Sequence, residues 1–242
     1  MASSMQRYIS KELTHFVGRK LAFETDQYDL LMKILKEGWL THENHTPNVS
    51  GNLWVNMSAK MSQNEMYSLQ MVCFCDIPKE DLALHTEKYS RFGLSFDKDF
   101  IVEKGGTPVY YLPKEAKVDL FFQKVSKGAY FDKMIQDYHE LSQLFHTLIM
   151  KSSTTAGVPK DSHRLQELEF FFNFHILSQV QFFDHRLADN DPNNYYFERE
   201  WRVIGNVQFN IEDVKRILIP REYGKAFRQD CPQYHGELTF LD

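Results

Sequence analysis

A chain of 242 residues with 43% hydrophobic and 25% charged content is typical of a globular protein and can bury one sizeable core. Its apolar runs are far shorter than the roughly 20 residues that cross a bilayer, and no signal-peptide pattern opens it, so we expect a cytoplasmic protein without membrane contact. A net charge of −5 argues against a broad basic nucleic-acid surface but leaves open a local groove lined by Lys124, Lys127 and Lys133.

The first part of the chain predicts a strand, a helix and a long loop. Residues 8–17 end in a short strand-like stretch. Asp26 is placed to cap a helix and Gly38 to end it, with apolar residues at helical spacing between them. Trp39 resumes an extended path, and the polar, turn-rich residues 41–64 form a long loop with at most one short element.

Strands dominate the next part of the chain. Residues 71–78 form a compact strand that ends at a proline, and residues 80–89 suit a short helix. Residues 93–96 and residues 107–113 are further strand candidates.

The middle of the chain is helical. Its apolar residues recur at intervals of three and four and form one continuous stripe: Phe131, Met134, Ile135, Tyr138, Leu141, Phe145, Leu148 and Ile149. A second helix is predicted from Ser162 into the phenylalanine-rich segment near Leu177. The 20 phenylalanines are concentrated in the second half, which predicts either a heavy aromatic core or a deep apolar pocket there, with core packing favoured.

The last part returns to strands, over residues 180–183, 195–204, 216–219 and 238–241. The fold class is therefore α+β, with a mixed or antiparallel sheet as its core. No repeat, low-complexity tract or long linker marks a domain boundary. We expect a single domain over residues 1–242 with a helical, phenylalanine-rich insertion over about residues 114–178.

Two acidic residues in the strand predicted near the C-terminus are the first candidates for chemistry. Glu198 and Glu200 are two residues apart, so on a strand both side chains point to the same face. Paired carboxylates in a cleft acquire different pKa values, and one of them then acts as a base or stabilises a developing cation. The alternative is a solvated strand face that also carries Arg202.

Other familiar chemical motifs are weak or absent from the sequence. His42 and His45, or Cys73 and Cys75, have a spacing that metal ligands use, but no second matching pair accompanies them, so we expect no metal site. The cysteines number three, give no disulfide framework, and fit small buried residues on a strand. Because the chain lacks a phosphate-binding glycine loop and a nucleophile elbow, kinase and hydrolase activities have no support.

Several motifs, in order along the chain, resemble the bacterial abortive-infection AbiGi family. The central ones are Met71-Val-Cys-Phe-Cys-Asp-Ile-Pro, His85, Tyr89, Phe92-Gly-Leu-Ser, Phe100 and Gly106-Thr-Pro-Val-Tyr-Tyr-Leu. The opening motifs are His15-Phe and Ile34-Leu-Lys-Glu-Gly-Trp-Leu, and the closing ones are Phe197-Glu-Arg-Glu-Trp-Arg and Ile217-Leu-Ile-Pro. Residues 114–174 do not align. The resemblance implies a role in phage defence, as an antitoxin-like module that binds a nucleotidyltransferase-like toxin.

A second, fainter resemblance concerns the order of motifs in ADP-ribosyltransferases, including the DNA-modifying DarT group. It implies that His15 binds the nicotinamide-side ribose of NAD and that Arg19 neutralises the pyrophosphate. It further implies that Tyr89 or Phe92 stacks on the nicotinamide ring and that Ser95 supports the late glutamates. The chain departs from that pattern after Ser95, where Phe-Asp follows and no second hydroxyl stands two residues on.

The same resemblance gives the two glutamates separate roles. Glu200 would stabilise the ribosyl cation as nicotinamide leaves, and Glu198 would position the acceptor, which would be a nucleic acid or a protein. Three hypotheses therefore stand: a non-catalytic module that restrains a toxin, an NAD-dependent transferase, and a nuclease or nucleic-acid binder. The transferase requires one cleft that joins His15, Tyr89 and Glu200. The binding module predicts an exposed apolar patch instead and ranks first.

Overall fold

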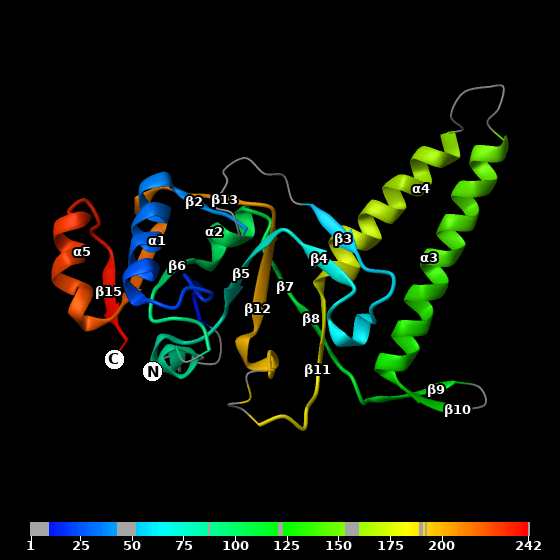
Figure 1. Ribbon diagram of the computed structural model, residues 1–242, viewed down its shortest axis with the longest axis horizontal. Helices are drawn as coiled ribbons and strands as arrows, with labels where there is room; N and C mark the ends of the chain where they lie inside the picture. Colours follow the sequence, from blue (N-terminus) through cyan, green and yellow to red (C-terminus); the bar gives the residue numbers. More distant parts are fainter. Residues whose placement is uncertain are drawn as a thin grey trace, which may run out of the picture. The chain divides into compact units, whose positions relative to one another are not determined.

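The computed structural model describes residues 10–42, 52–86, 88–120, 123–152, 160–188, 191 and 193–241. The chain forms two compact units that each contain several segments of the sequence. Unit 1 comprises Met1–Asn52, Gln70–Pro108 and Tyr195–Asp242, and unit 2 comprises Leu53–Leu69 and Val109–Asn194. Both contain helices and strands, which confirms the α+β class (Figure 1). The single domain with an insertion stays a prediction, and the helices of residues 114–178 lie in unit 2.

Unit 1 is built on a seven-stranded sheet with the order β15-β14-β6-β1-β5-β12-β7. The strands are β1 (Glu12–Phe16), β5 (Met71–Cys75), β6 (Gly93–Asp97), β7 (Thr107–Pro108), β12 (Glu200–Ile204), β14 (Val214–Ile219) and β15 (Glu237–Phe240). Only β14 and β15 pair in parallel within this sheet, so the sheet is mixed, as the sequence predicts. A separate antiparallel pair joins β2 (Trp39–Leu40) to β13 (Val207–Gln208).

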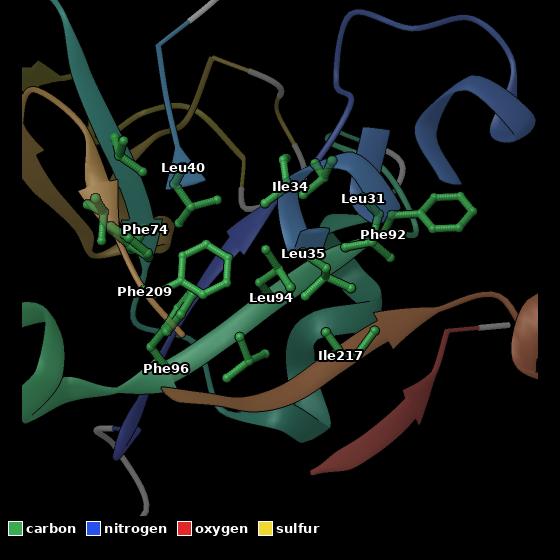
Figure 2. Close-up of a cluster of buried hydrophobic side chains, with 14 of the residues drawn as sticks. Leu31, Ile34, Leu35, Leu40, Phe74, Phe92, Leu94, Phe96, Phe209 and Ile217 are labelled. Atoms are coloured by element: carbon green, nitrogen blue, oxygen red, sulfur yellow. The ribbon is translucent and has the colours of Figure 1, made fainter. Parts of the chain in front are cut away.

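One face of this sheet carries the larger hydrophobic core (Figure 2). Helix α1 (Glu24–Glu37) contributes Leu31, Ile34 and Leu35, which recur at helical spacing on its buried side. They gather with Leu94 and Phe96 of β6, both fully buried. Removal of this apolar surface from water is the main stabilising contribution in unit 1.

The start of α1 differs from the prediction and its end agrees with it. Asp26 lies inside the first turn and does not cap the helix, because the capping position is occupied by Phe23. Gly38 adopts a left-handed conformation with φ 69°, and its N–H donates to the carbonyl of Ile34. Glycine populates this conformation without the steric cost that a Cβ imposes, which explains its place there.

Short elements account for most other differences in unit 1. Residues 80–89 were expected to form a helix, and a 3₁₀ helix, η2, occupies Lys79–His85. Two helices of six and seven residues, α2 (Lys98–Glu103) and α5 (Gly224–Asp230), were not predicted. The predicted strand over residues 107–113 is divided, since β7 belongs to unit 1 and β8 (Tyr110–Pro113) to unit 2. The remaining 3₁₀ helices of unit 1 are η5 (Tyr196–Glu198), η6 (Ile211–Asp213) and η7 (Arg221–Tyr223).

Unit 2 combines three two-stranded pairs with two long helices. Its strands are β3 (Leu53–Val55), β4 (Tyr67–Leu69), β8, β9 (Lys117–Leu120), β10 (Gln123–Ser126) and β11 (Val180–Phe183). β8 and β11 are parallel, and the other two pairs, β3 with β4 and β9 with β10, are antiparallel. The helical elements are η1 (Met61–Gln63), α3 (Lys127–Ser152), α4 (Lys160–Phe170), the π-helix η3 (Phe171–Ile176) and the 3₁₀ helix η4 (Leu177–Gln179).

The core of unit 2 is small, and much of the apolar surface of its helices stays exposed. Met61, Met66, Ile135, Leu177 and Phe182 form the buried cluster. The predicted apolar stripe of α3 is present, but Leu141, Leu144, Phe145 and Leu148 are exposed on it. Phe170, Phe171 and Phe172 are exposed as well. The prediction that the aromatic side chains pack into a core is therefore wrong for the helical region. No helix among the described residues is both long and apolar enough to cross a bilayer.

Candidate functional site

The two glutamates predicted to share a strand face occupy different structures. Glu198 ends the 3₁₀ helix η5, and Arg199 then adopts a left-handed conformation with φ 43°. β12 begins only at Glu200. The turn at Arg199 is held by its guanidinium, which donates to the carbonyl of Asp76 at 2.9 and 2.6 Å. The paired-carboxylate strand is therefore a wrong prediction, although both acids lie near Cys73 and raise its pKa.

Glu198 is buried in an ionic and aromatic cluster. Its carboxylate forms an ion pair with Lys88, and the two side chains keep only 6% and 14% of their surface exposed. The ammonium of Lys88 lies 4.1 Å from the ring centroid of Tyr195, a favourable cation–π distance. The paired charges stabilise each other in a site from which water is largely excluded.

Tyr89 extends this cluster toward β1. Its ring stacks on Phe16 with centroids 5.3 Å apart, and the Arg19 guanidinium lies 4.9 Å from the Tyr89 centroid. Burial and the nearby, hydrogen-bonded Glu198 carboxylate raise the pKa of Tyr89 far above its ordinary value. The phenol therefore stays protonated at neutral pH and serves as a hydrogen-bond donor.

Glu200 faces a different set of groups. Arg202 donates to its two carboxylate oxygens at 2.9 and 3.1 Å, a bidentate pair that neutralises both charges. Cys73, which pairs with Arg202 across β5 and β12, has its pKa raised by burial and by Glu200. The thiol is therefore protonated and unreactive at neutral pH. This arrangement stabilises the sheet and leaves Glu200 already neutralised by Arg202.

His15 and Glu200 lie on opposite faces of the sheet. Thr14 and Glu200 both pair with Cys75, so these three share one face. His15 follows Thr14 and points to the other face, where its ring lies 5.8 Å from that of Phe74. The geometry therefore separates the two residues that the transferase hypothesis places in one cleft.

Ser95 is also apart from the glutamates. Its hydroxyl is 2.7 Å from that of Thr14, and the residue is fully buried. Strands β1 and β5 separate it from β12. Of the six predicted site residues, Arg19, Tyr89 and Glu198 meet. His15 lies on the opposite face of the sheet, and Ser95 and Glu200 have other partners, Thr14 and Arg202. The NAD-related roles of all six stay predictions.

The described residues give no geometric support to a metal site or to a lysine-lined groove. No group of three or more metal-ligating side chains was found among the described residues, and His45 lies outside them. Two of the groove lysines face acids: Lys124 pairs with Asp119 at 3.5 Å and Lys133 with Asp137 at 2.5 Å.

A cavity of about 960 Å³ in unit 1 lies away from every predicted site residue. It is lined at the end of α1 by Lys36 and Met32, and elsewhere by Phe209, Ile211 and Asp230. Lysines and acids alternate with apolar side chains there, so the cavity has no single chemical preference.

The most distinctive surface of unit 2 is a group of exposed apolar side chains where α4 passes into η3. Leu168, Phe170, Phe171 and Phe172, hereafter the η3 apolar group, are each between 41% and 55% exposed. π-helical turns are rare and occur often at functional sites. The run of three phenylalanines is visible in the sequence, but the pattern alone favoured burial.

The structure thus defines a class: an α+β protein whose helical region exposes apolar side chains of the kind that mark interaction surfaces. Comparison with protein families matches residues 42–228 to the family described as "Putative abortive phage resistance protein AbiGi, antitoxin". The match spans well over half of the chain, which therefore belongs to the AbiGi family and has its abortive-infection, antitoxin-like role. Searches of curated proteins and of solved structures give no match. The AbiGi resemblance is thereby confirmed, and none of these comparisons shows a relation to ADP-ribosyltransferases.

Proposed function

We propose that this protein restrains a toxin by direct protein–protein contact, through the η3 apolar group. The observation that carries the proposal is the exposure of Leu168, Phe170, Phe171 and Phe172 within one short segment. Transfer of large apolar side chains from water into an interface is favourable by about 25 cal/mol per Å² of apolar surface buried. Family membership supports a toxin as that partner.

The local structure supports a rigid binding surface. The ring of Phe170 stacks on that of Phe174 with centroids 4.4 Å apart, and the ring of Phe172 lies 6.0 Å from that of Tyr138 in α3. These contacts restrict the side chains before a partner arrives, which lowers the entropy that binding must overcome. Aromatic residues held in this way dominate the free energy of many interfaces.

The test replaces Phe171 and Phe172 together by serine. We expect the variant to lose protection of bacteria that produce its partner toxin, for which a nucleotidyltransferase-like toxin is the candidate. Since each aromatic anchor contributes about 2 kcal/mol, the dissociation constant measured by calorimetry should rise by roughly 100-fold or more.

The matched control is Phe23→Ser, which removes a phenylalanine that is 68% exposed in unit 1. It should protect as well as the unaltered protein. Circular dichroism verifies that both variants are folded. Full protection by the folded double variant would exclude the η3 apolar group as the binding surface.

A further inference from the structure

Helix α3 carries two parallel apolar stripes of which only one is covered. Ile135, Tyr138 and Ile149 recur at helical spacing and lie on the shielded side, where Tyr138 approaches Phe172. Leu141, Leu144, Phe145 and Leu148 form a second stripe, hereafter the open stripe, and they are 64%, 55%, 47% and 55% exposed. A helical period of 3.6 residues places the open stripe directly beside the shielded one.

The open stripe exposes more apolar surface than is usual for a helix face that stays in contact with water. Together with Met134, also exposed, it presents on the order of 500 Å² of apolar surface, as large as the largest patch on a typical monomer. A standard interface buries about 800 Å² on each partner, so this stripe with its polar border is enough for one.

The spacing of the open stripe is self-complementary. If two α3 helices pack antiparallel about a two-fold axis between residues 144 and 145, Leu141 of each copy meets Leu148 of the other. The same axis brings Leu144 against Phe145. A closed two-fold dimer requires a surface that matches itself in this way.

The charges at the edge of the stripe have the same symmetry. Asp137 is seven residues before Leu144 and Lys151 seven residues after it, so all three lie along one edge of the helix. Asp137 pairs with Lys133 of its own helix. The antiparallel arrangement also brings Lys151 of each copy next to Asp137 of the other, whereas a parallel one places this edge of the two copies on opposite sides of the contact. Complementary charges contribute orientation more than affinity.

We propose that the open stripe is a self-association surface and that a second copy of this chain covers it, with the two α3 helices antiparallel. The proposed contact uses none of the residues of the η3 apolar group. The inference therefore does not depend on the identity of any toxin.

Sedimentation equilibrium of the full chain tests the proposal. The unaltered protein should have twice its chain mass of 28.7 kDa at micromolar concentration. Leu144→Glu with Leu148→Glu should restore the monomer mass, with a dissociation constant raised more than 100-fold. Leu168→Glu, at a side chain of the same exposure in α4, should leave the dimer intact.

Charge reversal tests the orientation. Asp137→Lys should weaken the dimer, and the added Lys151→Asp should restore it. A monomer at all concentrations, a dimer that the stripe variant does not weaken, or an Asp137→Lys loss without rescue would overturn the proposal. If the unaltered protein is monomeric and the stripe variant loses protection against the toxin, the stripe is a toxin surface, which also overturns self-association.

Discussion

The buried ion pair between Lys88 and Glu198 lies at the centre of an ionic and aromatic cluster. Both charges are shielded from water, and Tyr89 and Tyr195 surround them. The free energy that such a pair adds over an apolar pair is small, because removing each charge from water is costly. Breaking the pair has a much larger effect, because it leaves one buried charge without its counter-ion.

Lys88→Met should therefore lower the free energy of unfolding by about 3–5 kcal/mol, measured by urea denaturation. The added Glu198→Met should recover most of that loss. Lys33→Met is the control, since its exposed pair with Glu37 spans 3.9 Å and contributes under about 0.5 kcal/mol. Equal effects of Lys88→Met and Lys33→Met would show that Glu198 is solvated.

At the scale of elements, periodicity predicts long segments well and fails at short irregular ones. The apolar spacing in α1 and α3 and the compact strands β5 and β11 are visible in the sequence because each element repeats one burial pattern. The turn at Arg199 is not visible, since it depends on a contact with the distant Asp76 carbonyl. The sequence does not show which of the predicted site residues meet, because the order of motifs does not reveal which face of β1 holds His15.

Substitution of Gly38, the glycine that ends α1, distinguishes backbone strain from steric crowding when it is compared with the same substitution at Gly105. A Cβ on Gly38 would lie 2.7 Å from the carbonyl oxygen of Phe209, whereas one on Gly105 would meet nothing within 4 Å. Both glycines have positive φ, at 69° and 86°. Gly105→Ala should lower the free energy of unfolding by about 1 kcal/mol from strain alone, and Gly38→Ala by clearly more. Equal melting temperatures of the two variants would contradict a steric role for Phe209.

The whole molecule contains separate hydrophobic cores. The large core of unit 1 lies on one face of the seven-stranded sheet, and the small core of unit 2 includes Phe182. The unit with the smaller core is also the one that exposes the open stripe and the η3 apolar group. Apolar side chains used for binding are not available for folding, so unit 2 should be the less stable of the two.

Scanning calorimetry tests this expectation with one substitution in each core. Phe182→Ala should lower the temperature of the first of two transitions, because a buried phenylalanine contributes roughly 3–5 kcal/mol to the free energy of unfolding. Phe96→Ala should move only the upper one. If both substitutions shift one common transition, the chain unfolds as the single domain that its sequence predicts.

The interleaving of the two units also sets an order of events during synthesis. Unit 2 is complete once Asn194 has left the ribosome, but unit 1 still lacks the segment Tyr195–Asp242. Until then β5 has no β12 and β6 has no β14, so a three-stranded sheet presents two open edges. Such edges pair with other chains and attract chaperones and proteases. A polypeptide that stops before Tyr195 thus keeps both edges of this sheet open, and we expect the cell to degrade it.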